Sequence, residues 1–167
     1  HIKVKTRRRK IDVPPHGKIT KNNFAEFSGT KILVAEDNII NQKVISGLLA
    51  DSGIEITIAN DGQIALEILQ ENHDFNLILM DAHMPRIDGF QATRAIRANP
   101  LYEHIVIVAL SGDTAVDDIR KMKDSGMEEF LKKPLHINDL YDVLYAYTKE
   151  DSQNDEFVYV VKTKALN

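Results

Sequence analysis

Three acidic residues stand directly after two short apolar runs, where they could hold a metal ion. Glu36 and Asp37 follow the run 31–35, and Asp81 follows the run 77–80. If both runs are strands of a parallel sheet, their carboxyl ends meet at one edge, where ligands collect in open α/β sheets. Crowded carboxylates repel one another unless a cation compensates. Mg²⁺ suits such a shallow site with few protein ligands.

Two further residues extend this chemistry. Ser111 follows the apolar run 104–110, and Lys133 follows the short run 129–131. With a metal and a lysine to neutralise phosphoryl oxygens and a serine hydroxyl to bond one of them, Asp81 could act as a nucleophile and form an aspartyl phosphate. The spacing therefore favours phosphoryl transfer to a carboxylate.

The elements that must position these residues alternate between strands and helices. Near-continuous apolar strands joined by amphipathic helices predict a parallel sheet covered on both faces, with a doubly wound topology. The predicted strands are 31–35, 54–59, 76–80, 104–110 and 129–131; the predicted helices are 39–51, a segment around 64–69, 88–98, 113–124 and 137–148.

Composition and charge divide the chain into three parts. We expect a basic linker or arm at 1–30, the α/β domain at 31–148, and a C-terminal tail at 149–167 whose run 157–161 could form an extra strand. Residues 1–30 carry eight Lys/Arg against two acids, a net +6; since the whole chain carries −4, the other 137 residues carry −10. A basic arm of this kind is usually a solvated linker, although it could contact an anionic surface.

Several classes of protein are disfavoured by the totals. The chain has no cysteine, which excludes disulfides and thiolate metal sites. No apolar run approaches the roughly 18 residues that span a membrane, so we expect a cytoplasmic protein whose fragment makes no membrane contact. The chain begins with His1 rather than Met, which suggests a fragment of a longer protein.

The motifs together resemble a response-regulator receiver domain of two-component signalling, over residues 31–148. The matching segments are 35–38, 79–85 with Asp88-Gly89, 109–112 and 130–134. The spacing is 44 residues from Asp37 to Asp81, 30 from Asp81 to Ser111, and 22 from Ser111 to Lys133. The resemblance implies a flavodoxin-like (βα)5 fold with strand order 2-1-3-4-5. It also implies that the domain promotes its own phosphorylation and dephosphorylation without turning over an external substrate.

The resemblance assigns the metal site and the phosphoacceptor. Asp81 resembles the phosphoacceptor, while Glu36 and Asp37 resemble the acidic pair that holds Mg²⁺, for which Mn²⁺ can substitute. Asp81 and the backbone carbonyl of His83 would complete the protein ligands.

The same resemblance assigns the switch. Ser111 matches the switch hydroxyl, and Lys133 the phosphate-pairing lysine with Lys132 beside it. The bond before Pro134 is a candidate for the cis form. Phe130 stands where many members have Tyr, so a hydroxyl is absent from that position.

The stretch Ala35-Glu36-Asp37-Asn38, with Asn41-Gln42 after it, is similar to receivers of hybrid histidine kinases and phosphorelays. This implies docking of a histidine kinase or histidine phosphotransfer domain on a surface formed by residues 38–41. It also allows the fragment to belong to a membrane-bound hybrid kinase.

Other functions stay open at this point. A haloacid-dehalogenase-type phosphatase also uses an Asp nucleophile, but such an enzyme requires a second Asp at the position that His83 occupies in this chain. A phospho-independent pseudo-receiver would bind partners without chemistry. Only 19 residues follow residue 148, too few for a winged helix, so nucleic-acid binding is disfavoured, although the basic arm could still touch nucleic acid. The fifth-helix face or the run 157–161 could support a homodimer.

Overall fold

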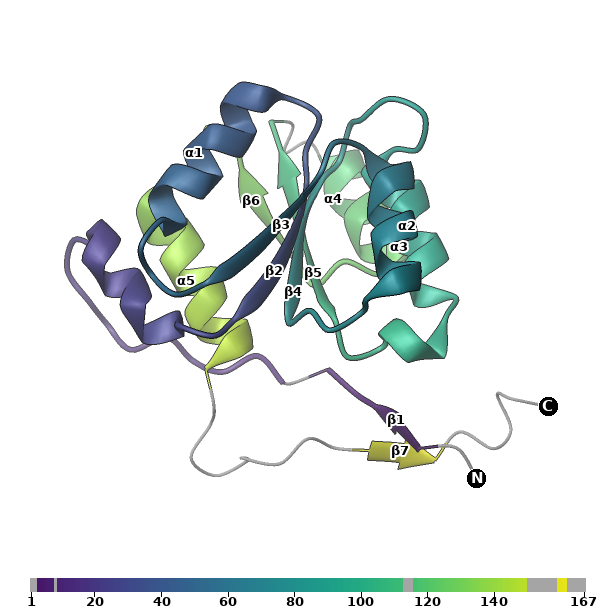
Figure 1. The fold of residues 1–167 in the computed structure, drawn as a ribbon, viewed down its shortest axis with the longest axis horizontal. Coiled ribbons are helices and arrows are strands. Elements are labelled where there is room, and N and C mark those ends of the chain that lie inside the picture. The colour runs from purple at the N-terminus through teal and green to yellow at the C-terminus, as the bar shows by residue number, and fades with distance from the viewer. Residues whose placement is uncertain (1–2, 8, 113–115, 150–158, 162–167) are drawn as a thin grey trace.

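A five-stranded parallel sheet forms the centre of the computed structural model, which describes residues 3–7, 9–112, 116–149 and 159–161 (Figure 1). The strand order is β3-β2-β4-β5-β6, which is 2-1-3-4-5 when the five strands are counted along the chain and confirms the expected topology. The strands are β2 (Lys31–Ala35), β3 (Glu55–Ala59), β4 (Leu77–Asp81), β5 (Val106–Ser111) and β6 (Glu129–Lys132). The helices are α1 (Ile39–Leu49), α2 (Gly62–Glu71), α3 (Gly89–Arg97), α4 (Val116–Ser125) and α5 (Ile137–Thr148).

Helices cover both faces of this sheet. On one face α1 and α5 pack against side chains such as Ile32, Leu79 and Val108, and on the other α2, α3 and α4 pack against Leu33, Ile78 and Ile107 (Figure 1). The strand residues alternate between the two faces, as a period of two requires. Burial on both faces explains why β4 and β5 read as continuous apolar runs.

The ends of several elements differ slightly from those expected. Asp81 is the last residue of β4 rather than the residue after it. The turn η2 (Pro100–Tyr102) delays the start of β5 to Val106. Helix α1 ends at Leu49, because Asp51 and Gly53 adopt left-handed φ angles of 61° and 84° that no helix continues. The predicted start of the fourth helix, at 113–115, lies outside the described residues.

Side-chain caps fix the start of three helices, α1, α2 and α3, at the carboxyl edge of the sheet. Asn38 accepts a hydrogen bond from the backbone N–H of Asn41, and Asp61 accepts one from that of Ile64. Asp88 and Gln91 form a reciprocal capping box at α3. These caps define the loops that carry the candidate site.

The segment before the sheet packs against the domain. The short helix η1 (Lys21–Phe27) buries Phe24 and Phe27 against Tyr141 of α5, with ring centroids 6.1 and 5.4 Å away. Further back, β1 (Lys3–Lys5) pairs antiparallel with β7 (Tyr159–Val161) in a separate two-stranded sheet. Within the part of the chain that the structure describes, no helix has the length and apolar character to cross a membrane.

Candidate metal and phosphoryl site

The carboxylates of Glu36, Asp37 and Asp81 meet at the carboxyl edge of the sheet. β2 and β4 are adjacent and parallel, with Ala35 opposite Met80, so the residues that end them come together. One oxygen from each of the three carboxylates lies within 4.8 Å of the others. Glu36 and Asp81 are buried, whereas Asp37 is exposed, so the cluster opens to solvent on one side.

Lys133 brings a positive charge into this cluster. Its Nζ lies 3.1 Å from Glu36 Oε1 and 3.1 Å from Asp81 Oδ1. Its backbone N–H donates to the carbonyl oxygen of Ser111 at 2.9 Å, which ties the end of β6 to the end of β5. The Lys133–Pro134 peptide bond is cis, as the resemblance suggests.

The two buried carboxyl groups have opposite pKa shifts. Burial, together with the neighbouring carboxyl group of Glu36, raises the pKa of Asp81 from 3.8 to about 7. Burial opposes ionisation of Glu36 as well, but hydrogen bonds from Asp81, Lys133 and Asn41 outweigh it and lower the pKa of Glu36. A proton shared by the pair therefore resides on Asp81 when no other cation is present.

A divalent cation fits this donor set. The second oxygen of Glu36, Oε2, is buried and has no hydrogen-bond partner, an arrangement that is costly unless a ligand satisfies it. Three carboxylates against one lysine leave excess negative charge, and carboxylate oxygens are ligands that Mg²⁺ prefers. Glu36, Asp37 and Asp81 could therefore hold the ion.

The structure also places the other predicted site residues. The His83 side chain is exposed, and its N–H donates to Asp81 Oδ1 at 3.3 Å, so its backbone lies at the site while the role of its carbonyl stays a prediction. Ser111 is buried at the end of β5, opposite the exposed Lys132 in the β5–β6 pairing. Phe130 is half-buried on β6 against the α2–α3–α4 side of the core.

Two supporting contacts were not anticipated from the sequence. The side-chain amide of Gln42 donates to the backbone carbonyl of Glu36 at 2.6 Å and to Asn60 Oδ1 at 2.9 Å, which joins the ends of β2 and β3. Arg86, at a left-handed φ of 67°, makes a two-pronged ion pair with Asp61 that anchors the loop after β4 to the start of α2. The motif Asn41-Gln42 could have pointed to the first contact, but no pattern pointed to the second.

Comparison with known proteins assigns the family. The response regulator receiver domain family matches residues 32–145, well over half of the chain. The chain belongs to this family. The receiver's curated relatives include hybrid signal transduction histidine kinase I of Dictyostelium discoideum, with 39% identity over 136 residues that cover 75% of this chain and 8% of the kinase. The receiver thus spans less than a tenth of that relative.

Solved structures agree with this assignment. The receiver domain of sensor histidine kinase PA1611 from Pseudomonas aeruginosa, crystallised with a magnesium ion in its active-site cleft, is 33% identical, with a TM-score of 0.66 over 72% of this chain and 98% of that one. The receiver domain of Ssk1 in its co-crystal with the histidine phosphotransfer protein Ypd1 of Saccharomyces cerevisiae is 28% identical, with a TM-score of 0.63 over 75% of this chain and 97% of that one. The fold and the signalling class of this receiver follow.

Proposed function

We propose that Asp81 accepts a phosphoryl group from a phosphohistidine in a Mg²⁺-dependent step, and that the phosphorylated state changes partner binding. The observation that carries this proposal is the single cluster in which three carboxylates lie within 4.8 Å of one another and Lys133 contacts two of them. A binding-only module has no need to bury two carboxylates around a lysine, because burial without chemistry only costs stability.

The transfer requires no further reactant. An Asp81 carboxylate oxygen attacks phosphorus, the P–N bond of the phosphohistidine breaks, and the imidazole leaves with the electron pair and takes up a proton. Mg²⁺ bound by the three carboxylates would neutralise charge on the phosphoryl oxygens. Lys133 would pair with a second phosphoryl oxygen, and the Ser111 hydroxyl would donate to a third. Later attack by water would return Asp81 to its free state, so no external substrate is turned over.

The decisive experiment is phosphorylation by a small donor. With acetyl phosphate and Mg²⁺, intact mass spectrometry should show one added phosphoryl group of about 80 Da on the wild-type chain and none on Asp81→Asn or in EDTA. Asp74→Asn is the matched control, because Asp74 is an exposed carboxylate bonded to Lys31, which begins β2 at the opposite end of that strand. Equal labelling of wild type and Asp81→Asn would exclude the proposed function.

We propose further that α1 and the loop after β6 receive the phosphodonor protein. Ile39 and Ile40 are 63% and 71% exposed in the first turn of α1, and Val44 follows on the next turn. A small groove of about 90 Å³ separates Val44 from Pro134 and Leu135, beside Lys133. An exposed apolar patch next to a charged site suits a partner helix with an apolar face.

Phosphorylated Ypd1 is a suitable probe for this surface, since its complex with a related receiver is known. Ile40→Asp should slow transfer from Ypd1 at least tenfold, the cost of about 1.4 kcal/mol of binding energy, while labelling by acetyl phosphate stays unchanged. Val116→Asp, which changes an exposed apolar residue on α4, is the control. Loss of labelling from both donors would mean that Ile40→Asp damages the fold rather than the docking surface.

The readout of phosphorylation is the final part of the proposal. Ser111 and Phe130 lie on the adjacent strands β5 and β6, with Phe130 paired to Ala109 two residues before Ser111. Movement of Ser111 toward a phosphoryl group would open space that the Phe130 ring could enter, which shifts the population of two packing states. Without a phenolic hydroxyl, the ring position would depend on packing alone.

A further inference from the structure

The segment that precedes η1 lies along β6 and α5 as an extended strap. We define the strap as residues 6–19, of which the structure describes all except residue 8. The backbone N–H of Ile11 donates to the carbonyl oxygen of Ala146 at 2.9 Å, and that of Ile19 donates to Asn138 Oδ1 at 3.2 Å. Val13 packs against the core beside α5, and Ile19 is buried in it. The strap is therefore held against the domain by hydrogen bonds from its backbone and by apolar contacts.

Three basic residues of the strap form ion pairs with acidic residues of the domain. Arg7 pairs with Glu128 at 2.7 Å, Lys10 with Glu129 at 2.9 Å, and His16 with Asp142 at 2.6 Å. The partners are more than 100 residues apart in sequence, and their charges match the net +6 of residues 1–30 against the −10 of the rest. The start of β6 and the outer side of α5 thus form a surface lined by acidic residues, and an extended basic segment binds along it.

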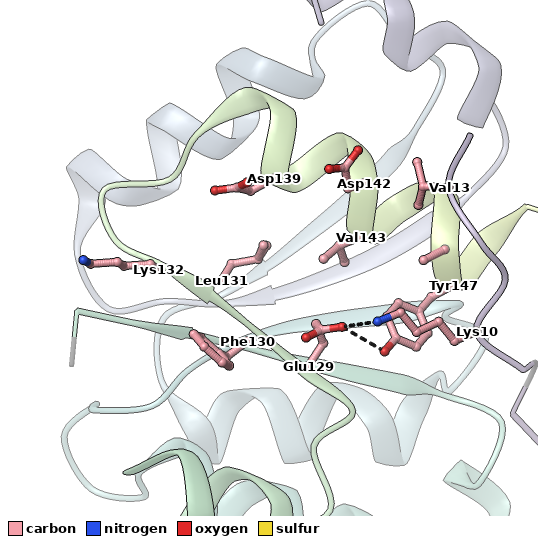
Figure 2. A pocket seen from close by; sticks show the side chains of 11 residues that line it. Lys10, Val13, Glu129, Phe130, Leu131, Lys132, Asp139, Asp142, Val143 and Tyr147 are labelled. Carbon is pink, nitrogen blue, oxygen red and sulfur yellow. Dashed lines mark hydrogen bonds and ion pairs between the residues drawn. The ribbon is translucent and has the colours of Figure 1, made fainter. Parts of the chain in front are cut away.

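The strap leaves part of this surface open. A groove of about 320 Å³ lies between Lys10 and Val13 of the strap and residues of β6 and α5. Figure 2 shows the side chains that line it. The Glu129 carboxylate lies at the junction, since it accepts from Lys10 Nζ at 2.9 Å and from the Tyr147 hydroxyl at 3.2 Å (Figure 2). Any shift of Glu129 would alter both contacts at once.

Strand β6 connects this junction to the phosphoryl site. Glu129 begins the strand, Phe130 follows it, and Lys133 lies directly beyond its end with contacts to Glu36 and Asp81. The distance from Glu129 to Lys133 along an extended chain is about 13 Å. In Figure 2 Phe130 projects from β6 on the side opposite to Leu131, so the ring and the Glu129 side chain flank the same short strand. Because Glu129 and Phe130 are consecutive in this strand, a rearrangement of Phe130 that moves the β6 backbone would also move the residue that holds Lys10.

We propose that the β6–α5 surface is an exchangeable docking site for an extended basic segment, occupied by the strap in the unphosphorylated state and vacated when Asp81 is phosphorylated. This inference rests on the proposed function of Asp81. The pairs Lys10–Glu129 and His16–Asp142 are suited to exchange, because the side chains of Lys10 and Asp142 are 59% and 45% exposed and such pairs are individually weak. The released surface and the released strap would both become available to other contacts.

Hydrogen exchange of the complete 167-residue chain tests the proposal. The Ile11 amide is the reporter, because it is bonded to Ala146 and lies in the middle of the strap. With acetyl phosphate and Mg²⁺, exchange across residues 9–19 should accelerate about tenfold, within the usual range of coupling between two sites. The buried turns of α5 around Leu140 and Leu144 should keep their protection. Intact mass measured on the same sample reports whether Asp81 carries the phosphoryl group.

Reversing the charges of the Lys10–Glu129 pair provides a second test, in which the strap is perturbed and the phosphorylation of Asp81 is measured. Lys10→Glu places like charges together at Glu129 and should loosen the strap in the unphosphorylated chain. By linkage, it should also increase the phosphorylated fraction at limiting acetyl phosphate severalfold. Lys10→Glu combined with Glu129→Lys restores the opposite charges. This double variant should return the hydrogen-exchange rate of the strap and the phosphorylated fraction toward their wild-type values. Lys18→Glu, an equal change at an exposed strap position, is the control.

The outcomes separate the two proposals. Labelled Asp81 with unchanged exchange at residues 9–19 would overturn the exchangeable site and leave the proposed function intact. Absence of label on Asp81 would overturn both. Accelerated exchange that also occurs in Asp81→Asn with the same reagents would assign the effect to Mg²⁺ or the donor, and would likewise overturn the coupling. Labelling with release of the strap in wild type alone supports the proposal.

Discussion

Replacing Asp81 with Asn should stabilise the metal-free protein at neutral and alkaline pH. The pKa of Asp81 rises from 3.8 to about 7 in the folded state because the carboxyl group is buried beside Glu36. Between these two values the folded state holds a proton that the unfolded state has lost. Stability therefore falls as pH rises through this window, and is fully retained only below about pH 4. The amide of the Asp81→Asn variant carries no charge to bury.

The size of the effect follows from the shift. Each pKa unit corresponds to about 1.36 kcal/mol, so the rise in the pKa of Asp81 from 3.8 to about 7 costs about 4 kcal/mol once its carboxyl group is ionised. From pH 5 to pH 8 the expected loss is about 2 to 3 kcal/mol, since part of the cost is already present at pH 5. Glu36, whose pKa is lowered from 4.5 in the folded state, adds only a small slope of the opposite sign near pH 5.

The assay is urea unfolding followed by far-UV circular dichroism in EDTA, at pH 5 and at pH 8, for wild type and Asp81→Asn. The difference between the two proteins isolates Asp81 and the groups in contact with it, because His16 and Glu128, whose pKa values are also raised, contribute equally to both. Asp81→Asn should gain about 2 to 3 kcal/mol relative to wild type between the two pH values. Mg²⁺ at 100 times its dissociation constant should restore about 2.7 kcal/mol to wild type at pH 8.

A difference between the proteins that stays constant to within about 0.5 kcal/mol from pH 5 to pH 8 would refute this reasoning. It would mean that Asp81 is ionised in the folded state across the whole range, and that Lys133 alone compensates its burial.

Three other changes test the site and its support. Lys133→Met removes the cation that contacts Glu36 and Asp81, and should slow labelling by acetyl phosphate about a hundredfold in a mass-spectrometric time course. Gln42→Leu removes the bond to the Glu36 carbonyl and should weaken Mg²⁺ binding about 3- to 10-fold in titration calorimetry, with maximal labelling unchanged at saturating Mg²⁺; a fall in maximal labelling instead would contradict a positioning role. Phe24→Ala should lower the free energy of unfolding by about 3 to 5 kcal/mol in urea, because η1 buries this ring fully although it precedes the family-matched residues.

The sheet and its functional edge could be predicted because local patterns determine them. Apolar runs such as 77–80 are long enough only for buried strands, and parallel pairing then brings their carboxyl ends together. Caps such as Asn38 mark where each loop becomes a helix. The positions of Glu36, Asp81 and Lys133 follow from these two rules, and the structure places the three side chains in contact.

Contacts made by polar side chains across large sequence distances could not be predicted in this way. The basic residues before position 20 suggested a solvated arm, because their acidic partners, such as Glu129 and Asp142, are more than 100 residues away and become neighbours only when α5 packs on the sheet. The Gln42 contact depends likewise on the path of the loop after β2, and the Arg86 contact on a left-handed backbone angle. The motif Asn41-Gln42 hints at the first contact, whereas no residue pattern encodes the second.

The site itself is unfavourable for the stability of the fold, and this supports a role in chemistry. Two buried carboxyl groups share one lysine, one of them retains a proton near neutral pH, and Glu36 Oε2 has no partner. Neutral side chains of similar size would fill the same space at lower cost. Local rules of stability are broken mainly where function requires it. A divalent cation and a phosphoryl group would supply the charges and partners that the folded chain lacks at this edge.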